Sequence, residues 1–346
     1  MGNWTVLSFW AALVAILWAG RRHTVFWPLL ALGLLLVFNQ AFTPGFFALE
    51  VRGGHLYGAR IDILNEGAKV MLLSLGMTLV IATGGVDLSV GATMAIAGAV
   101  AAQGVVASHL PAPIAIAAAL GVSALAGAWN GLLVAVLRIP PIVATLILMV
   151  AGRGIAQLIT AGQIITFNDP LLSYLGNGWL FGLPFTLTIV LLAFGLTALL
   201  TRRTALGLFI EAIGDNETAS RFTGLPAATV KFFVYVFSGL CAGLAGLVAA
   251  GNIRSADANH AGLYLELDAI IAVVVGGTAL AGGRFYLAGS LVGALLMQTL
   301  TTTLYALDVS ADVATVPKAL VILAACLLQS PNFRARLVRL RPRRAS

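Results

Sequence analysis

Charged residues are scarce in this chain. Asp, Glu, Lys and Arg make up 10% of its 346 residues, whereas a soluble domain carries about 25%. So few charges, together with 60% hydrophobic residues, exclude an ordinary soluble domain. The apolar runs are continuous, and the strands of a transmembrane β-barrel would instead alternate apolar and polar residues over about ten positions. The composition therefore predicts an all-α, polytopic bundle of membrane helices.

Cysteines and catalytic motifs are also scarce. Cys241 and Cys326 both lie inside apolar segments, which excludes a disulfide framework and the residue spacing of a metal site. The sequence has no GxxxxGK[ST] motif, so it does not bind ATP through a P-loop, and it has neither HExxH nor GxSxG. We therefore expect a non-catalytic membrane subunit, with no catalytic residue, metal or cofactor of its own.

The net charge of +7 is concentrated at one end of the chain. Six arginines lie between Arg334 and Arg344, directly after an apolar run. Such a tail is typical of the cytoplasmic side of a membrane helix, where it faces anionic lipid. The positive charge therefore indicates membrane lipid as a partner, not nucleic acid, and residues 331–346 are predicted to be a basic cytoplasmic tail.

Apolar runs are abundant, and about 20 apolar residues suffice to span a bilayer. The runs lie at 4–20, 25–42, 67–84, 90–108, 113–137, 141–160, 179–200, 231–250, 268–280, 285–305 and 313–329. The run at 268–280 is short and two glycine pairs follow it, so we expect a broken or re-entrant helix there. The sequence predicts about ten transmembrane helices within a domain at 25–330, or eleven if 4–20, in the N-terminal segment 1–24, also spans.

The arginines predict the orientation of these helices. When positions 21–22 are placed inside, thirteen arginines fall on the inner side: those two, five in internal loops and six in the tail. Only Arg52, Arg60 and Arg254 fall outside, which satisfies the positive-inside rule. The C-terminus and the loop 201–231 are therefore predicted to be cytoplasmic.

The loop 201–231 is the longest polar interruption in the second half of the sequence. It contains a short amphipathic piece, in which Leu206, Phe209, Ile210 and Ile213 recur at helical spacing. A membrane protein with no soluble domain can still present one structured loop to a soluble partner. We interpret this loop as such a docking surface.

The chain contains a weak internal repeat. Gly131–Ala151 and Gly293–Ala325 both show a glycine-led apolar helix, a turn, Val-Ala-Thr and a second helix. The predicted directions are opposite, as in the inverted repeats of many transporters; chance similarity between two apolar segments is the alternative. Three GxxxG pairs, beginning at Gly127, Gly239 and Gly289, predict close packing of helices.

Polar side chains within the spans are candidates for a translocation path, because a polar group in the bilayer core is costly and usually faces a cavity or a partner. The candidates are Asp87, Ser89, Asn130, Arg153, Gln157 and Gln298. For Asp87 and Ser89 the alternative role is to cap a helix that begins near Val90. For the other four it is an interhelical hydrogen-bond network.

The polar stretch 252–268 falls on the predicted outer side of the membrane. Asn252, Asp257 and Asn259 are its candidates for contact with an extracytoplasmic partner. A solvated loop without a partner is the alternative.

Three stretches of the sequence together resemble a known family. They are ATGGVDLSVGA, GLFIEAIGDNETASRFTGL and LELDAIIAVVVGGTALAGGRFYLAGSLVGAL. In this order they resemble the membrane permeases of bacterial ABC importers for ribose, xylose, arabinose and galactosides, and the resemblance covers nearly the whole chain from about residue 25. PPIVATLILMVAGRGIAQLITAGQIITFN and IRSADANHAGLYLELDAI are similar to the galactofuranose permeases of that family. Segment 4–20 departs from it, because it is more apolar than the expected leader.

The resemblance implies a function and a set of partners. The chain would be an inner-membrane permease subunit that translocates a monosaccharide, best matched by galactofuranose, with another pentose or hexose such as ribose as the alternative. It would work with a periplasmic sugar-binding protein, a cytoplasmic ABC ATPase that uses ATP and Mg, and a second homologous permease, a heterodimer being favoured. Residues 207–224 match the family's ATPase-coupling segment, with contact candidates Gly207, Glu211, Gly214, Asp215, Asn216, Arg221 and Gly224.

Other functions would need features that the sequence shows less clearly. An ion-coupled secondary transporter would need paired intramembrane carboxylates, a role open to Asp87 and Asp268. A branched-chain amino acid as substrate would call for an anion-binding arginine cluster along the path, which the spans lack. A membrane-embedded enzyme would need a nucleophile and a base, and the four histidines stand only at the ends of apolar segments.

Overall fold

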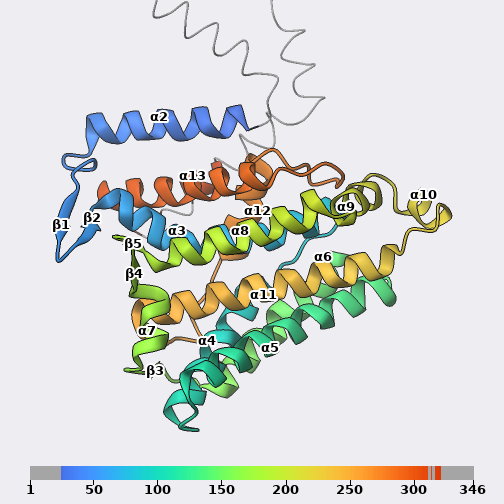
Figure 1. Ribbon diagram of the computed structural model, residues 1–346, viewed down its shortest axis with the longest axis horizontal. Coiled ribbons are helices and arrows are strands. Elements are labelled where there is room, and N and C mark those ends of the chain that lie inside the picture. The colour runs from blue at the N-terminus through green and yellow to red at the C-terminus, as the bar shows by residue number, and fades with distance from the viewer. Residues whose placement is uncertain (1–24, 311–312, 314–315, 321–346) are drawn as a thin grey trace, which may run out of the picture.

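The computed structural model describes residues 25–310, 313 and 316–320, and these form a bundle of helices (Figure 1). The helices are α2 (Phe26–Phe42), α3 (Ala59–Ala82), α4 (Val90–Val106), α5 (Ala112–Gly131) with its π-helical continuation η1 (Leu132–Val136), α6 (Pro141–Ile159), α7 (Pro170–Asn177), α8 (Phe185–Arg203), α9 (Leu206–Asp215), α10 (Glu217–Phe222), α11 (Ala227–Ile253), α12 (Leu265–Val275) and α13 (Leu287–Ala306). The short strands are β1 (Glu50–Arg52), β2 (His55–Tyr57), β3 (Ile165–Thr166), β4 (Trp179–Leu180), β5 (Leu183–Pro184) and β6 (Ser255–Ala256). The predicted segment 4–20, the tail 331–346 and the end of the second repeat copy lie outside the described residues.

Helices occupy the predicted apolar runs between 25 and 305, whereas the number of about ten spans stays a prediction, because the run 4–20 and most of the run 313–329 lie outside the described residues. Six helices are long and apolar enough to cross a membrane: α3, α5 with η1, α6, α8, α11 and α13. The apolar helices α2 and α4 are shorter. The prediction of an all-α polytopic bundle is therefore confirmed.

Two helix boundaries differ from the prediction. α3 begins at Ala59 and not at 67, because its first turns carry charged side chains that an apolar-run criterion leaves out. α8 begins at Phe185 and not at 179, because 179–184 form the β4–β5 hairpin with Trp179 opposite Pro184. α3 is therefore longer at its start than predicted, and α8 is shorter.

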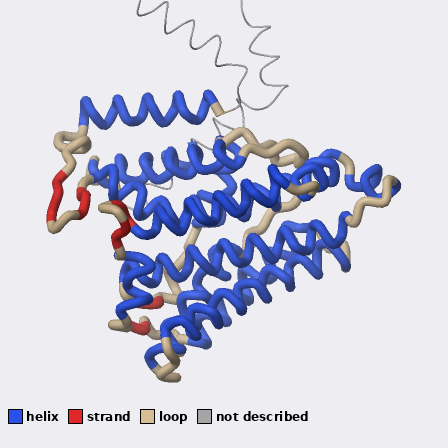
Figure 2. The backbone as a smooth tube through the Cα atoms, in the orientation of Figure 1, coloured by secondary structure: helices blue, strands red, loops and turns tan. Residues whose placement is uncertain are grey.

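The bundle has two distinct ends. The strands gather at one end, where the pairs β1–β2, β4–β5 and β3–β6 form three small sheets (Figure 2). The helices α9 and α10 lie at the opposite end (Figure 1). We call these the strand end and the α10 end.

Helix α11 lies at the centre of the bundle and packs against α3, α4 and α5. Glycines allow this approach: a Cβ added to Gly127 of α5 would lie 2.3 Å from the Tyr235 carbonyl oxygen, and one added to Gly239 of α11 would lie 2.3 Å from the Ser123 carbonyl oxygen. A Cβ on Gly293 of α13 would lie 2.0 Å from the Ala272 oxygen. The close packing predicted from the GxxxG pairs is confirmed, because each pair lies where two backbones meet.

The two helices next to the breaks, α4 and α12, stop short of a full crossing. α4 has 17 residues and α12 has 11, or about 25 and 16 Å at 1.5 Å per residue, against a hydrocarbon core of about 30 Å. The prediction of a broken helix at 268–280 is confirmed, with the break beginning at Gly276. The two breaks, 83–89 and 276–286, touch each other, since Gly283 N donates to the Ala82 carbonyl at 2.9 Å. This hydrogen bond pairs one backbone N–H of the second break with the end of α3, inside the bundle.

Candidate functional site

A buried carboxylate lies in the break between α3 and α4. Asp87 is 1% exposed. Its Oδ1 accepts hydrogen bonds from Ser89 N at 3.0 Å, Ser89 Oγ at 2.7 Å and Asn130 Nδ2 at 3.3 Å, and its Oδ2 accepts one from Ser238 Oγ at 2.9 Å. Asn130 Nδ2 also donates to Ser89 Oγ at 2.7 Å. Asp87 therefore links the break to α5, which carries Asn130, and to α11, which carries Ser238.

This network contains three of the predicted path residues, Asp87, Ser89 and Asn130. The predicted alternative role of Asp87 and Ser89 is to cap the helix that begins near Val90. α4 begins at Val90 as predicted, but the Ser89 side chain makes no capping hydrogen bond. Its Oγ instead donates to Asp87 and accepts a hydrogen bond from Asn130 Nδ2, so the hydroxyl is used within the buried network. The sequence analysis missed Ser238, which stands alone in an apolar run and shows no spacing signal.

Two polar side chains of α6, Arg153 and Gln157, hold part of the polar stretch 252–268 in place. Arg153 Nη1 donates to the carbonyls of Ala258 at 3.1 Å and Ala261 at 2.6 Å. Gln157 Nε2 donates to Asn259 Oδ1 at 2.8 Å. The structure thus brings two predicted path residues together with a predicted partner-contact residue. Their part in translocation stays a prediction.

The segment 254–264, which we call the strand-end segment, folds through its own polar contacts as well. Asp257 Oδ1 accepts hydrogen bonds from the backbone N–H groups of Asn259 and His260, and its Oδ2 lies 2.8 Å from His260 Nδ1. Burial raises the pKa of Asp257, but these hydrogen bonds outweigh it and hold the pKa below its usual value. Asn259 and His260 are exposed, so this segment presents polar groups at the strand end. Asn252, the third candidate, donates to Glu66 at 3.3 Å.

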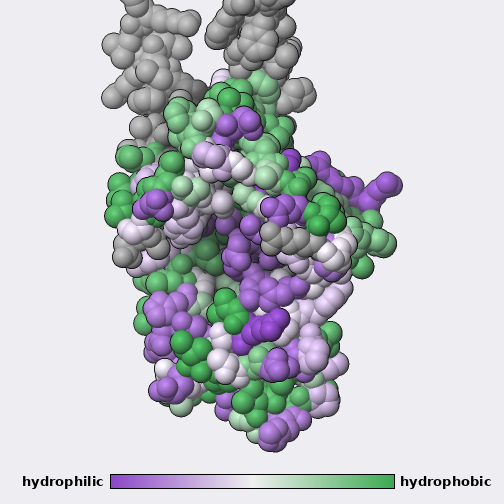
Figure 3. All heavy atoms as spheres, turned by 90° about the vertical axis from the view of Figure 1, so that its left-hand side faces the viewer, coloured by the Kyte–Doolittle hydropathy of each residue, from purple (hydrophilic) through white to green (hydrophobic). Residues whose placement is uncertain are grey.

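A cavity of about 630 Å³ lies beneath the strand-end segment. Polar residues on its wall are Glu66, Lys69, Ser255, Asp257, His260, Tyr264, Asp268, Gln298, Thr301, Tyr305 and Lys318. Hydrophilic surface also collects around the middle of the strand end (Figure 3). Of the six predicted path residues, Gln298 is the one that lines this cavity in the described part of the chain. The sequence analysis did not assign the other polar residues of the lining to the path, because they come from separate segments: α3, the strand-end segment, the start of α12, α13 and residue 318.

At the α10 end, the predicted docking loop is two short helices joined by a tight corner. Within α9, Ile210 and Ile213 are buried against the bundle, as the amphipathic pattern predicted, whereas Leu208 is 71% exposed. Phe222 at the end of α10 is 88% exposed. Asp215 is exposed at the corner. The loop therefore shows two large apolar side chains and a carboxylate to its surroundings.

Most of the predicted coupling residues shape this corner. The Asn216 side chain caps α10 by accepting a hydrogen bond from Ala219 N at 2.9 Å, and Gly224 has the positive φ of +83° that ends α10. A Cβ added to Gly207 would lie 2.1 Å from the Thr201 carbonyl oxygen. Glu211 is half-buried on α9.

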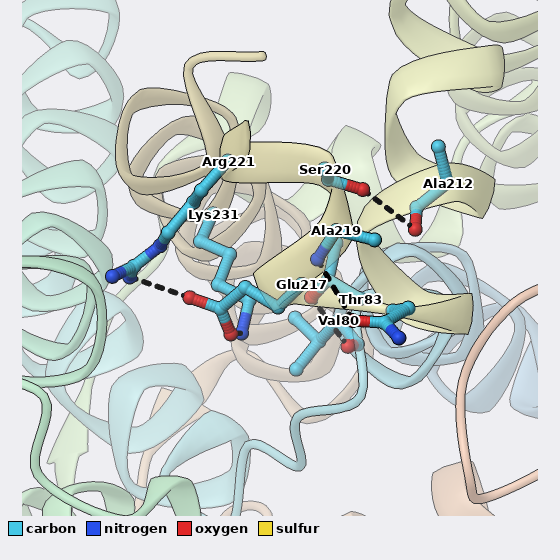
Figure 4. A network of polar contacts seen from close by, with 9 residues as sticks. Val80, Thr83, Ala212, Glu217, Ala219, Ser220, Arg221 and Lys231 are labelled. Carbon is cyan, nitrogen blue, oxygen red and sulfur yellow. Dashed lines mark hydrogen bonds and ion pairs between the residues drawn. The ribbon is translucent and has the colours of Figure 1, made fainter. Parts of the chain in front are cut away.

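An ion cluster that the sequence analysis missed ties α10 to α11. Glu217 Oε1 accepts a hydrogen bond from Arg221 Nη2 at 2.6 Å, and its Oε2 accepts one from Lys231 Nζ (Figure 4). Glu217 and Arg221 are four residues apart on a helix, a spacing that predicts an ion pair between them. The contact with Lys231 depends on the turn between the helices and has no such signal.

The end of α9 touches both helix breaks. A Cβ added to Gly214 would lie 1.8 Å from the Ala82 carbonyl oxygen and 2.4 Å from Gly283 N, and one added to Gly282 would lie 2.8 Å from the Gly214 oxygen. Gly84 and Gly282 have φ values of +77° and +92°, which only glycine adopts readily. We call Gly84, Gly214, Gly282 and Gly283 the glycine junction. It joins the exposed loop to the Asp87 network across a few residues.

A bundle of membrane helices with broken helices, a polar cavity at one end and an exposed docking loop at the other defines a membrane permease. The family of the branched-chain amino acid transport system / permease component matches residues 59–326, and the chain belongs to this family. It is a multi-pass protein of the inner membrane, and the permeases of this family work with an ATPase and a periplasmic binding protein.

Several curated proteins are similar to the chain over most of its length. It is 53% identical to the galactofuranose transporter permease protein YtfT of Escherichia coli, over 89% of this chain and 91% of that protein. It is 40% identical to the fructose import permease protein FruF of Bifidobacterium longum, over 89% and 88%, and 38% identical to the ribose import permease protein RbsC of Escherichia coli, over 90% and 97%. No solved structure matches the chain.

Proposed function

We propose that this chain is the permease subunit of an ATP-driven sugar importer, with galactofuranose as the best candidate substrate. The observation that carries the proposal is the 53% identity to a galactofuranose permease along nine tenths of the chain. Fructose and ribose permeases follow at lower identity, so a sugar is common to these relatives.

The strand end faces the periplasm and the α10 end the cytoplasm in this proposal. Arg138 and Arg221 lie together at the α10 end, where they line one hollow, and Arg202 and Arg203 end α8 beside α9. At the strand end lie Arg52 of β1, Arg60 in the first turn of α3 and Arg254 after α11. These are fewer than the arginines of the α10 end once Arg284, next to the glycine junction, is counted there. This distribution supports the positive-inside orientation and a cytoplasmic C-terminus.

The loop at the α10 end is the proposed contact with the ATPase. Leu208 and Phe222 supply exposed apolar anchors, and Asp215 supplies a charge between them. Apolar anchors rimmed by charge are what a transient protein interface uses. Movement of the ATPase would reach the broken helices through the glycine junction, which contacts both breaks directly.

Transport in proteoliposomes tests this function. The chain is reconstituted with its ATPase, its binding protein and any second permease that co-purifies. The proposal predicts uptake of labelled galactose that needs ATP, survives an ionophore and is not matched by labelled leucine. Uptake that the ionophore abolishes, or uptake of leucine alone, would contradict it.

The second permease is tested by co-purification in mild detergent from the native membrane. We propose a heterodimer, so an ATPase and a second, related permease should accompany the chain. An ATPase with this chain alone would indicate a homodimer.

A further inference from the structure

Two lysine–carboxylate pairs line the strand-end cavity. Lys69 Nζ lies 2.5 Å from Glu66 Oε2 on α3, and Lys318 Nζ lies 2.8 Å from Asp268 Oδ2 of α12. The ammonium groups are shielded, with side-chain exposures of 18% for Lys69 and 20% for Lys318. An ammonium carries three donors and a carboxylate about four acceptor positions. Each pair therefore keeps both donors and acceptors free for a third group.

Neutral polar groups and aromatic rings complete the wall. Gln298 and Thr301 come from α13, Tyr305 from its last turns, and Tyr264 from the start of α12. Tyr264 and Tyr305 are 58% and 52% exposed, so ring surface is accessible. Flat apolar ring faces next to convergent hydrogen-bonding groups suit a molecule that has C–H faces and hydroxyl edges.

The wall offers little to a zwitterionic substrate. A free amino acid needs an unpaired cation for its carboxylate, but Lys69 and Lys318 each already have a carboxylate partner. His260 Nδ1 is likewise occupied by Asp257. In the described lining both lysines are thus paired, which favours a neutral polyhydroxylated ligand because its hydroxyls can bridge a pair without separating it.

The size and cover of the cavity fit a small ligand. Its volume of about 630 Å³ lies within the range of about 300–1,000 Å³ typical of small-molecule sites. The strand-end segment covers it, and Arg153 fixes that segment through the Ala258 and Ala261 carbonyls. A ligand arriving at the strand end would meet this cavity before the helix breaks.

We propose that this cavity is a monosaccharide-binding site of the permease itself, with the two lysine–carboxylate pairs as its recognition groups. The inference rests on the proposed function, since it takes the cargo to be a sugar. It adds that the membrane subunit selects the cargo, in addition to any soluble receptor. Affinity is expected in the millimolar range, about −4 kcal/mol, because a transport site has to release its ligand.

Direct binding to the permease alone tests this site. The full chain in lipid nanodiscs, without ATPase or binding protein, is titrated with D-galactose, D-fructose, D-ribose and L-leucine in saturation-transfer NMR. We expect saturable sugar signals and no saturable leucine signal. A wild-type protein that gives no saturable sugar signal, or the same signal as empty nanodiscs, would overturn the proposal.

Matched variants locate the site. Asp268→Asn, which weakens the pair with Lys318, should reduce sugar affinity by about fivefold, while Asp308→Asn, at an exposed position outside the lining, should not. Gln298→Ala is a second variant that leaves both ion pairs intact and should also weaken binding. Unchanged affinity in both cavity variants would overturn the proposal. Sugar transport by the complete importer, with no sugar binding by the permease alone, would reject this site and leave the proposed function standing.

Discussion

At the scale of single residues, Asp87 shows how a buried charge fixes an irregular backbone. Four hydrogen bonds reach its carboxylate from three residues on different parts of the chain. Hydrogen bonds to a charged group contribute about 1.5–3 kcal/mol each. The network therefore stabilises a glycine-rich break that has no helix ladder of its own.

Replacing Asp87 by Ala should destabilise the protein strongly, by about 3 kcal/mol or more, because buried donors of Ser89, Asn130 and Ser238 lose their acceptor. Thermal unfolding of the detergent-solubilised protein measures this. Asp308→Asn, at an exposed site, is the control and should keep the wild-type melting temperature. A wild-type value for Asp87→Ala would show that the network carries no stability.

At the scale of elements, the glycine junction joins the docking loop to the two broken helices. At Gly214 and Gly282 the contacts are backbone to backbone, so a side chain cannot be added at either position without moving an element. The ion cluster of Glu217 then holds α10 against the start of α11. The loop is thus attached to the bundle at both of its ends.

Gly214→Ala should reduce ATP-driven uptake, because a Cβ there would lie 1.8 Å from the Ala82 oxygen and force α9 away from the breaks. Overpacking of this kind costs about 1–3 kcal/mol. Gly195→Ala on α8 is the matched control, since no atom lies within 4 Å of its added Cβ. Uptake and melting temperature are measured for both. Equal uptake in the two variants would remove the junction from the coupling route.

The Glu217 cluster should give a pH-dependent contribution to stability. Burial raises the pKa of Glu217, but Lys231 and Arg221 outweigh it, so the pKa lies below the ordinary 4.5. The stabilisation is therefore complete above pH 4.5 and is lost as the pH falls through the lower folded pKa.

Melting temperatures of the wild type and of Glu217→Gln check this prediction. The two curves should differ by a constant amount between pH 5.5 and pH 7 and converge below about pH 4.5. Asp308→Asn, at an exposed position outside the cluster, controls for general acid effects. A difference that persists unchanged to pH 3.5 would contradict the assignment.

At the scale of the whole molecule, the two ends of the bundle carry different structural features. The strand end holds the polar cavity and the α10 end holds the docking loop, with α3 and α11 connecting them. The proposed function would place the cargo and the energy source at opposite ends of one helical body. Coupling between them would then pass along the broken helices, as in other transporters with interrupted spans.

Charge reversal on the docking loop should uncouple the two ends. Asp215→Lys combined with Glu211→Lys should lower uptake about tenfold, equivalent to about 1.4 kcal/mol of lost docking energy, while the protein keeps its fold. Gln163→Lys adds a charge at an exposed position of the strand end and should leave coupling intact. The ratio of sugar taken up to ATP hydrolysed is the readout. An unchanged ratio in the double variant would exclude the coupling role.

The sequence by itself determined the class of protein, the approximate positions of the membrane helices and the position of the loop 201–231. A continuous apolar run forms a helix in lipid, because only a helix satisfies its backbone within the segment. The helical spacing of Ile210 and Ile213 is likewise a local property, so both features can be predicted from the order of residues. The family motifs likewise lie in contiguous stretches.

Only the tertiary structure decided which polar residues meet. Asp87 reaches Ser238 across 151 positions, Arg153 reaches Ala261 across 108, and Lys318 reaches Asp268 across 50. Such pairs depend on which helices lie side by side and in which register. Helix packing in a membrane is set by small residues and buried hydrogen bonds between distant segments, and periodicity along one segment does not encode it.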